Sequence, residues 1–161
     1  MAIDPNKPHF QRFGGLGDRA GISAHILKRT FFDGNVKVYE DEKGLLEKTE
    51  ISSPNGRVVV NKETEQGTGV SKYKKIEIFS LDNEPLNSID IIMENREMLN
   101  PSYRFYYGRT QIGRGKGEIA MNIAQKVLAD AGGVDPRFTA GSEVDQEVID
   151  TIIKILKRKT I

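Results

Sequence analysis

Residues 103–131, YRFYYGRTQIGRGKGEIAMNIAQKVLADA, contain the change of periodicity that decides the fold. The first five residues alternate between an aromatic face and a second face with Arg104 and Tyr106, the pattern of a half-buried strand. From residue 118 to 131 the apolar residues recur at helical spacing, and a Gly-Gly pair follows as a helix end signal. The chain is therefore predicted to pass from strand to helix within this stretch.

Upstream of this stretch the period of two recurs several times. The predicted strands are 35–39, 45–51, 57–60, 73–81, 88–93 and 103–107. Asn55-Gly56 supplies the positive-φ residues that a tight hairpin needs, which predicts antiparallel pairing of the second and third strands. The polar, glycine-spaced residues 61–71 predict a loop.

Residues 143–159 carry a second apolar stripe at helical spacing. Ser142 precedes it as the expected N-cap, and the acidic first half and basic last turns match the helix dipole. A run of strands followed by a run of helices favours an α+β fold over a parallel α/β sheet. We expect an antiparallel β-sheet of about five to six strands followed by two C-terminal helices.

The first thirty residues differ from the rest in composition. They contain FGGLGDRAG and few periodic apolar residues, which predicts an irregular N-terminal arm over 1–30 and a single domain over 31–161. A short helix is expected at 22–29. The arm combines bulky apolar and cationic side chains with glycines, either to bind a partner or to lie over the protein's own sheet. The candidate partner-binding residues are Phe10, Arg12, Phe13, Leu16 and Arg19.

The overall composition excludes several classes of function. The net charge of +1 provides no global attraction to nucleic acid or to an anionic membrane, so any such attraction must be local. The absence of cysteine excludes disulfides, thiol catalysis and thiolate metal sites. No apolar run approaches the roughly 20 residues of a membrane span, and no signal peptide is recognisable. We expect a cytoplasmic or otherwise intracellular protein with no membrane association.

The glycine-rich run at 108–117 invites comparison with a phosphate-binding Walker loop. Gly108 and Gly113 have the right separation, but Arg114 stands at the lysine position and Gly115 at the Ser/Thr position that would hold magnesium. A local positive patch remains, for nucleic acid or another anion, unless the run is simply a connection with solvated cations. The candidate residues are Arg104, Tyr106, Arg109, Arg114 and Lys116.

Catalytic and metal-binding patterns are not recognisable in the sequence. His9 and His25 lack the i, i+4 spacing of a helical metal site, and no G-x-S-x-G elbow occurs. The acidic groups at 39–42 and 93–97 are interpreted as solvated turns. We therefore predict no catalytic residue, no metal and no cofactor.

Three hypotheses for function follow. The first is a non-enzymatic binding or assembly module that engages a protein partner or its own copies through the N-terminal arm. The second is a nucleic-acid-binding domain that uses the basic patch and the neighbouring aromatic strand. The third is an enzyme whose site forms only in three dimensions.

Overall fold

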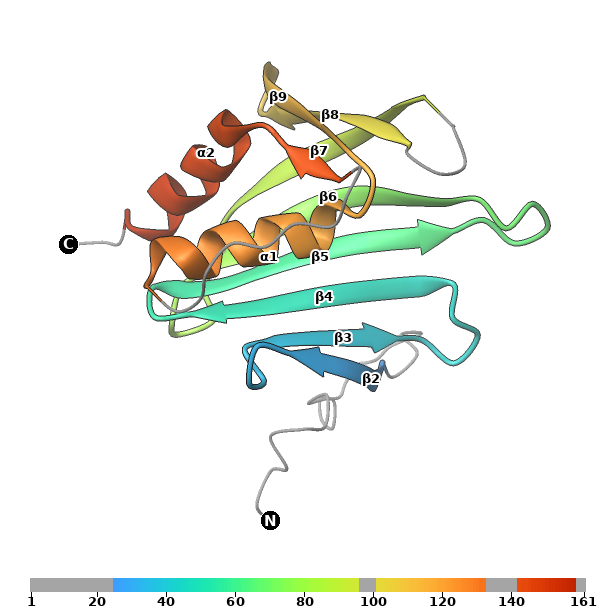
Figure 1. Cartoon of the computed structure of the whole chain (residues 1–161), viewed down its shortest axis with the longest axis horizontal. Helices are drawn as coiled ribbons and strands as arrows, with labels where there is room; N and C mark the ends of the chain where they lie inside the picture. Colours follow the sequence, from blue (N-terminus) through green and yellow to red (C-terminus); the bar gives the residue numbers. More distant parts are fainter. Residues whose placement is uncertain (1–24, 96–100, 133–141, 159–161) are drawn as a thin grey trace, which may run out of the picture.

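The structure is a computed structural model that describes residues 25–95, 101–132 and 142–158 (Figure 1). It is the predicted α+β fold, a large antiparallel sheet with two C-terminal helices. The strands are β2 (Ile26–Phe31), β3 (Val36–Glu40), β4 (Leu46–Ser53), β5 (Gly56–Thr64), β6 (Ser71–Phe79), β7 (Pro85–Asn95), β8 (Ser102–Tyr107), β9 (Thr110–Lys116) and β10 (Glu143–Val144). The helices are α1 (Ile119–Asp130) and α2 (Gln146–Leu156).

The described residues form one sheet of nine strands in the order β10-β9-β8-β7-β6-β5-β4-β3-β2. Each strand pairs antiparallel with its neighbour in the sheet. The expected number of five to six strands is therefore wrong. All six predicted strands are present as β3 to β8, and the additional ones are β2, β9 and β10.

The additional strands lack the alternation by which a strand is recognised. In β2 only Leu27 is partly buried and the other side chains are exposed, so residues 26–31 form an edge strand and not the end of the expected helix at 22–29. The predicted loop at 61–71 is also shorter than expected. Because β5 continues to Thr64 and β6 begins at Ser71, only residues 65–70 connect the two strands.

The predicted β4–β5 hairpin is confirmed, with a different turn. Ser53 pairs with Gly56, so Pro54 and Asn55 are the central turn residues, and of these four only Gly56 has a positive φ, +151°. A Cβ atom on Gly56 would also collide with the backbone carbonyl of Phe79. This glycine is therefore needed for close packing of neighbouring strands as well as for its backbone conformation.

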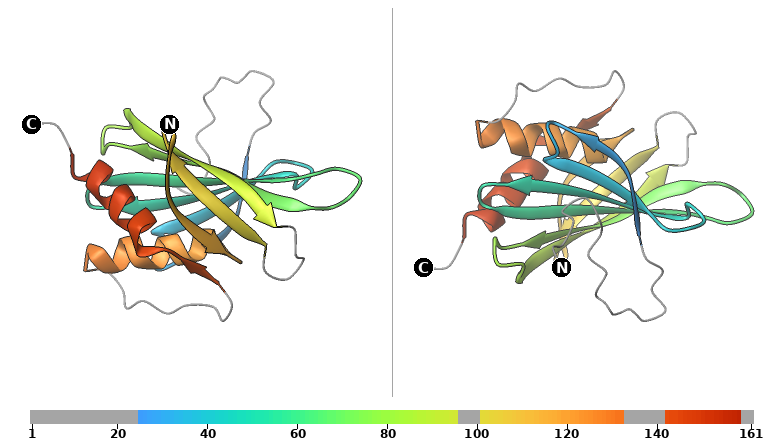
Figure 2. Two further views of the ribbon diagram at one scale, coloured as in Figure 1. Left: turned by 90° about the horizontal axis from the view of Figure 1, so that it is seen from above. Right: turned by 90° about the horizontal axis from the view of Figure 1, so that it is seen from below.

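Both helices lie over the same face of the sheet (Figures 1 and 2). The core lies between them and the strands, and its largest fully buried side chains include Tyr103, Phe105, Ile123 and Ile152. Burial of each such side chain contributes about 1.5–3 kcal/mol through the hydrophobic effect. The apolar stripes predicted for the two helices are thus buried against the sheet inside the domain.

The second helix begins later than predicted. Residues 143 and 144 pair with Lys116 and Gly115 as β10, and the helix starts after Asp145. Ser142 therefore does not cap this helix. Its Oγ instead accepts a 2.9 Å hydrogen bond from the backbone N–H of Glu118, at the start of α1.

The glycine-rich run is a hairpin strand and not a connection between strand and helix. Gly108 and Arg109 form the turn, and β9 follows at residue 110. A Cβ on Gly113 would lie 2.8 Å from Cγ2 of Val148, and one on Gly115 would lie 3.0 Å from the carbonyl oxygen of Glu143. The glycines thus allow α2 and β10 to pack closely against β9.

Candidate functional site

The face of the sheet opposite the helices carries the predicted basic residues. Tyr103 and Phe105 point into the core, so Arg104 and Tyr106, which alternate with them, point to the opposite face, over which neither described helix lies. Arg104 lies between two cross-strand neighbours, Ile92 on β7 and Arg114 on β9. We define the β7–β9 patch as Ile92, Glu94, Arg104, Tyr106 and Arg114.

Glu94 holds the two arginines of the patch together. Its Oε2 accepts a 3.0 Å hydrogen bond from Nε of Arg104, and forms ion pairs with Nη2 of Arg104 at 2.9 Å and with Nη2 of Arg114 at 3.6 Å. The hydrogen bond to Glu94, and then one to Tyr106, raise the pKa of Arg104. The Arg114 side chain remains 60% exposed, and Ile92 is 54% exposed. One carboxylate thus serves two guanidinium groups on an accessible surface.

A β-bulge places Glu94 in this position. Met93 pairs with Tyr103 and Asn95 pairs with Ser102, so Glu94 is the extra residue on β7. Bulges commonly redirect a side chain next to a functional site. The interpretation of residues 93–97 as a solvated turn is wrong for this residue, because Glu94 lies on a strand and pairs with both arginines.

The remaining predicted cations lie at two ends of the patch. Lys116 is on the same face as Arg114, and its Nζ lies 3.9 Å from Oε2 of Glu143. Arg109 is exposed in the β8–β9 turn, about five residues or roughly 15 Å from Arg114 along an extended strand. The fold therefore brings together Arg104, Tyr106, Arg114 and Lys116, and separates Arg109 from them. The arm candidates Phe10, Arg12, Phe13, Leu16 and Arg19 lie outside the described residues.

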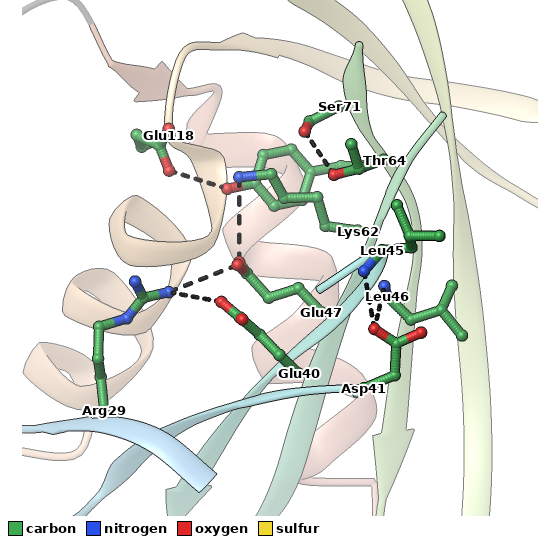
Figure 3. Close-up of polar contacts among 11 residues, drawn as sticks. Arg29, Glu40, Asp41, Leu45, Leu46, Glu47, Lys62, Thr64, Ser71 and Glu118 are labelled. Atoms are coloured by element: carbon green, nitrogen blue, oxygen red, sulfur yellow. Dashed lines mark hydrogen bonds and ion pairs between the residues drawn. The ribbon is translucent and has the colours of Figure 1, made fainter. Parts of the chain in front are cut away.

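A second polar cluster crosses the sheet from β2 to β6 on the face that carries α1 (Figure 3). Arg29 Nη2 lies 3.4 Å from Glu47 and 3.9 Å from Glu40, and Glu47 lies 3.9 Å from Nζ of Lys62. Nζ of Lys62 in turn lies 5.1 Å from the centre of the Tyr73 ring. No sequence pattern reveals this row, because its members come from separate strands and are aligned only by the sheet register.

The row ends at the first turn of α1. The Tyr73 hydroxyl donates a 3.1 Å hydrogen bond to Oε1 of Glu118. Burial of the ring, and then the negative charge of Glu118, raise the pKa of Tyr73 well above its usual value. A phenol held in its neutral form is a hydrogen-bond donor and not a nucleophile. This row is therefore better suited to fixing the helix on the sheet than to catalysis.

The described residues also line a cavity, but they form no metal-ligand cluster. A cavity of about 260 Å³ lies beside the β4–β5 hairpin, and none of its lining residues is ionisable: Asn35, Ser52, Ser53, Pro54, Leu128 and Ala131. Within residues 25–95, 101–132 and 142–158, no group of three or more His, Asp or Glu side chains is placed to hold a metal ion. Neither helix of these segments is long and apolar enough to cross a membrane.

Comparison with known proteins assigns no relative to this chain. No family model, no curated protein and no solved structure matches it. The β7–β9 patch and its chemistry are therefore the basis from which function is inferred.

Proposed function

We propose that this chain is a non-enzymatic binding module that contacts single-stranded nucleic acid through the β7–β9 patch. The observation that carries the proposal is the position of Arg104 and Arg114, which face each other on the side of the sheet opposite the helices and share one carboxylate. Tyr106 and the exposed Ile92 adjoin this pair. The patch thus combines two arginines and one carboxylate with apolar and aromatic surface, and Asp90 lies opposite Tyr106 on the neighbouring strand.

This combination suits unpaired nucleotides. Guanidinium groups neutralise backbone phosphates, and bases stack on aromatic side chains or on the guanidinium plane itself. An open sheet face is one of the surfaces on which proteins display such groups, because alternate side chains project from it in rows. In a duplex the bases are already paired and stacked, so we expect weaker binding of a duplex of equal length.

The test is a titration of the full chain into a labelled single-stranded oligonucleotide and its duplex, at low and at moderate salt. The patch variant R104A/R114A is compared with K43A/K154A, which removes two exposed cations away from the patch. We expect single-strand affinity to fall steeply with salt, and the patch variant to reduce the salt slope by about one to two. Absence of binding at both salt concentrations, or an equal loss in both variants, would contradict the proposal.

A second candidate function is assembly through the N-terminal arm. The arm candidates Phe10, Phe13 and Leu16 precede β2 in the chain, and β2 is an edge strand of the described sheet. An edge strand presents unpaired backbone groups to which a strand of another chain can add. In this proposal the arm's apolar side chains strengthen such a contact with a protein partner or with a second copy.

Self-association through the arm is tested by native mass measurement of the full chain over a range of concentrations. The variant F10A/F13A/L16A is compared with L81A, which truncates a leucine that is 67% exposed in the β6–β7 turn. We expect the unmodified chain and the L81A control to form oligomers, and the arm variant to remain monomeric. A monomer at every concentration would contradict self-association, and oligomers retained by the arm variant would place the contact elsewhere.

A further inference from the structure

Arg104 and Arg114 form an unfavourable pair by the ordinary rules of sheet pairing. They lie directly opposite each other on neighbouring strands, where like charges destabilise a sheet. The sheet contains the same arrangement with the signs reversed, where Glu40 and Glu47 lie opposite each other and share the cation Arg29. The arrangement therefore indicates an anion that both side chains contact.

Glu94 meets this requirement only in part. The contacts from both arginines converge on its Oε2, with the nearest nitrogens at 2.9 and 3.6 Å. A carboxylate carries one negative charge, whereas the arginine pair carries two positive charges. A phosphate group offers more acceptor oxygens, and two guanidinium forks can bind it through several charge-assisted hydrogen bonds.

We propose that Arg104 and Arg114 form a phosphate-binding pair and that Glu94 is its built-in competitor, occupying the pair until a phosphate displaces it. The inference rests on the proposed function, in which the phosphates belong to a nucleic-acid backbone. A free phosphate ion or monoester has the same chemistry and would displace Glu94 in the same way.

The bulge on β7 supports this role. As the extra residue of the bulge, Glu94 has no cross-strand partner in the β7–β8 register. Its side chain can therefore leave the arginines without breaking a cross-strand side-chain pair. The Arg114 contact is the longer of the two, at 3.6 Å, and is expected to exchange first.

The experiment compares Glu94→Gln with Glu84→Gln, which makes the same charge change in the exposed β6–β7 turn. Binding of inorganic phosphate and of a single-stranded oligonucleotide is measured separately for both variants and for the unmodified chain. We expect Glu94→Gln to strengthen both affinities about five- to tenfold, and Glu84→Gln to change them less than twofold. Weaker binding by Glu94→Gln, or equal effects of the two substitutions, would overturn the role of Glu94.

A stability measurement keeps the inference testable if affinity is low. Without ligand, Glu94→Gln should lower the thermal midpoint, because the arginines then repel each other without compensation. Phosphate, or the further substitution Arg114→Ala, should restore it. If neither phosphate nor Arg114→Ala raises the thermal midpoint of Glu94→Gln, the inference is overturned.

Different results would contradict the proposed nucleic-acid binding and the proposed role of Glu94. Phosphate binding without oligonucleotide binding would contradict the proposed function and keep the arginine pair as a phosphate site. Oligonucleotide binding that is unchanged by Glu94→Gln would contradict only the competitor role.

Discussion

Gly115 on β9 packs directly against the ring of Phe105 on β8. A Cβ atom at residue 115 would lie 2.9 Å from Cε1 of Phe105, closer than real Cβ contacts allow. It would also lie 3.0 Å from the carbonyl oxygen of Glu143 and 3.3 Å from Cγ2 of Ile119. Residue 115 is therefore the point at which the sheet, β10 and α1 meet, and only glycine fits there.

Gly115→Ala is expected to destabilise the protein by about 1–3 kcal/mol, the usual cost of overpacking a filled core. Gly115 does not have a positive φ, so the effect reports packing and not backbone strain. The measurement is urea unfolding, with Gln111→Ala as a control on an exposed position of the same strand. Equal stability of the two variants would show that β10 moves aside without cost.

Ser142→Ala is expected to lower the free energy of unfolding by about 0.5–1.5 kcal/mol, the net contribution of a typical hydrogen bond. Because Ser142 Oγ accepts from the N–H of Glu118, hydrogen exchange of that amide should accelerate. Ser52→Ala, at an exposed strand position, serves as the control. Faster exchange in the first turn of α2 instead would indicate that Ser142 caps its own helix after all.

The alkaline limit of stability is expected to depend on buried tyrosines. Burial, as the largest cause, raises the pKa of Tyr39 and of Tyr103 to about 12, and raises that of Tyr73 well above 10. An unfolded chain loses these protons near pH 10, so stability is full below that pH and is lost as pH rises towards 12.

Tyrosinate absorbance and circular dichroism, followed together against pH, test this expectation. The tyrosinate signal of the three buried residues should appear with the loss of secondary structure. Ionisation of all five tyrosines in a chain that is still folded would contradict it.

His25 is expected to resist protonation in the folded protein. Burial, and then the positive charge of Lys48, lower its pKa below 6.5, although Asp41 acts in the opposite direction. Because the unfolded chain takes up the proton first, the contribution of His25 to stability is present above pH 6.5 and is lost as pH falls.

The titration of the His25 ring by NMR measures this pKa directly. Lys48→Ala should move it upward, and His25→Gln should flatten the dependence of stability on pH between about 7 and 5. A ring pKa at or above 6.5 in the folded chain would contradict the assignment.

The fold class could be predicted from the periodicity of the sequence, but the number of strands in the sheet could not. On β3 the alternating residues Val36 and Val38 are buried because their face lies on the core, and both helices carry wide apolar stripes. The edge strand β2 has almost no buried face, and β9 contains two glycines where neighbouring elements approach closely. Neither strand carries the pattern by which strands are recognised.

The candidate site, too, could be predicted from the sequence only in part. The sequence by itself determined that Arg104 and Tyr106 share the face opposite Tyr103 and Phe105, because side chains alternate along any strand. Only the tertiary structure decided that Arg114 lies opposite Arg104 and that a bulge brings Glu94 between them. The register that opposes Arg114 to Arg104 follows from the Gly108-Arg109 hairpin turn and the shift after Phe105, and the position of Glu94 follows from a bulge. β9 and the bulge both depart from the simple alternation of buried and exposed residues, so periodicity alone does not reveal them.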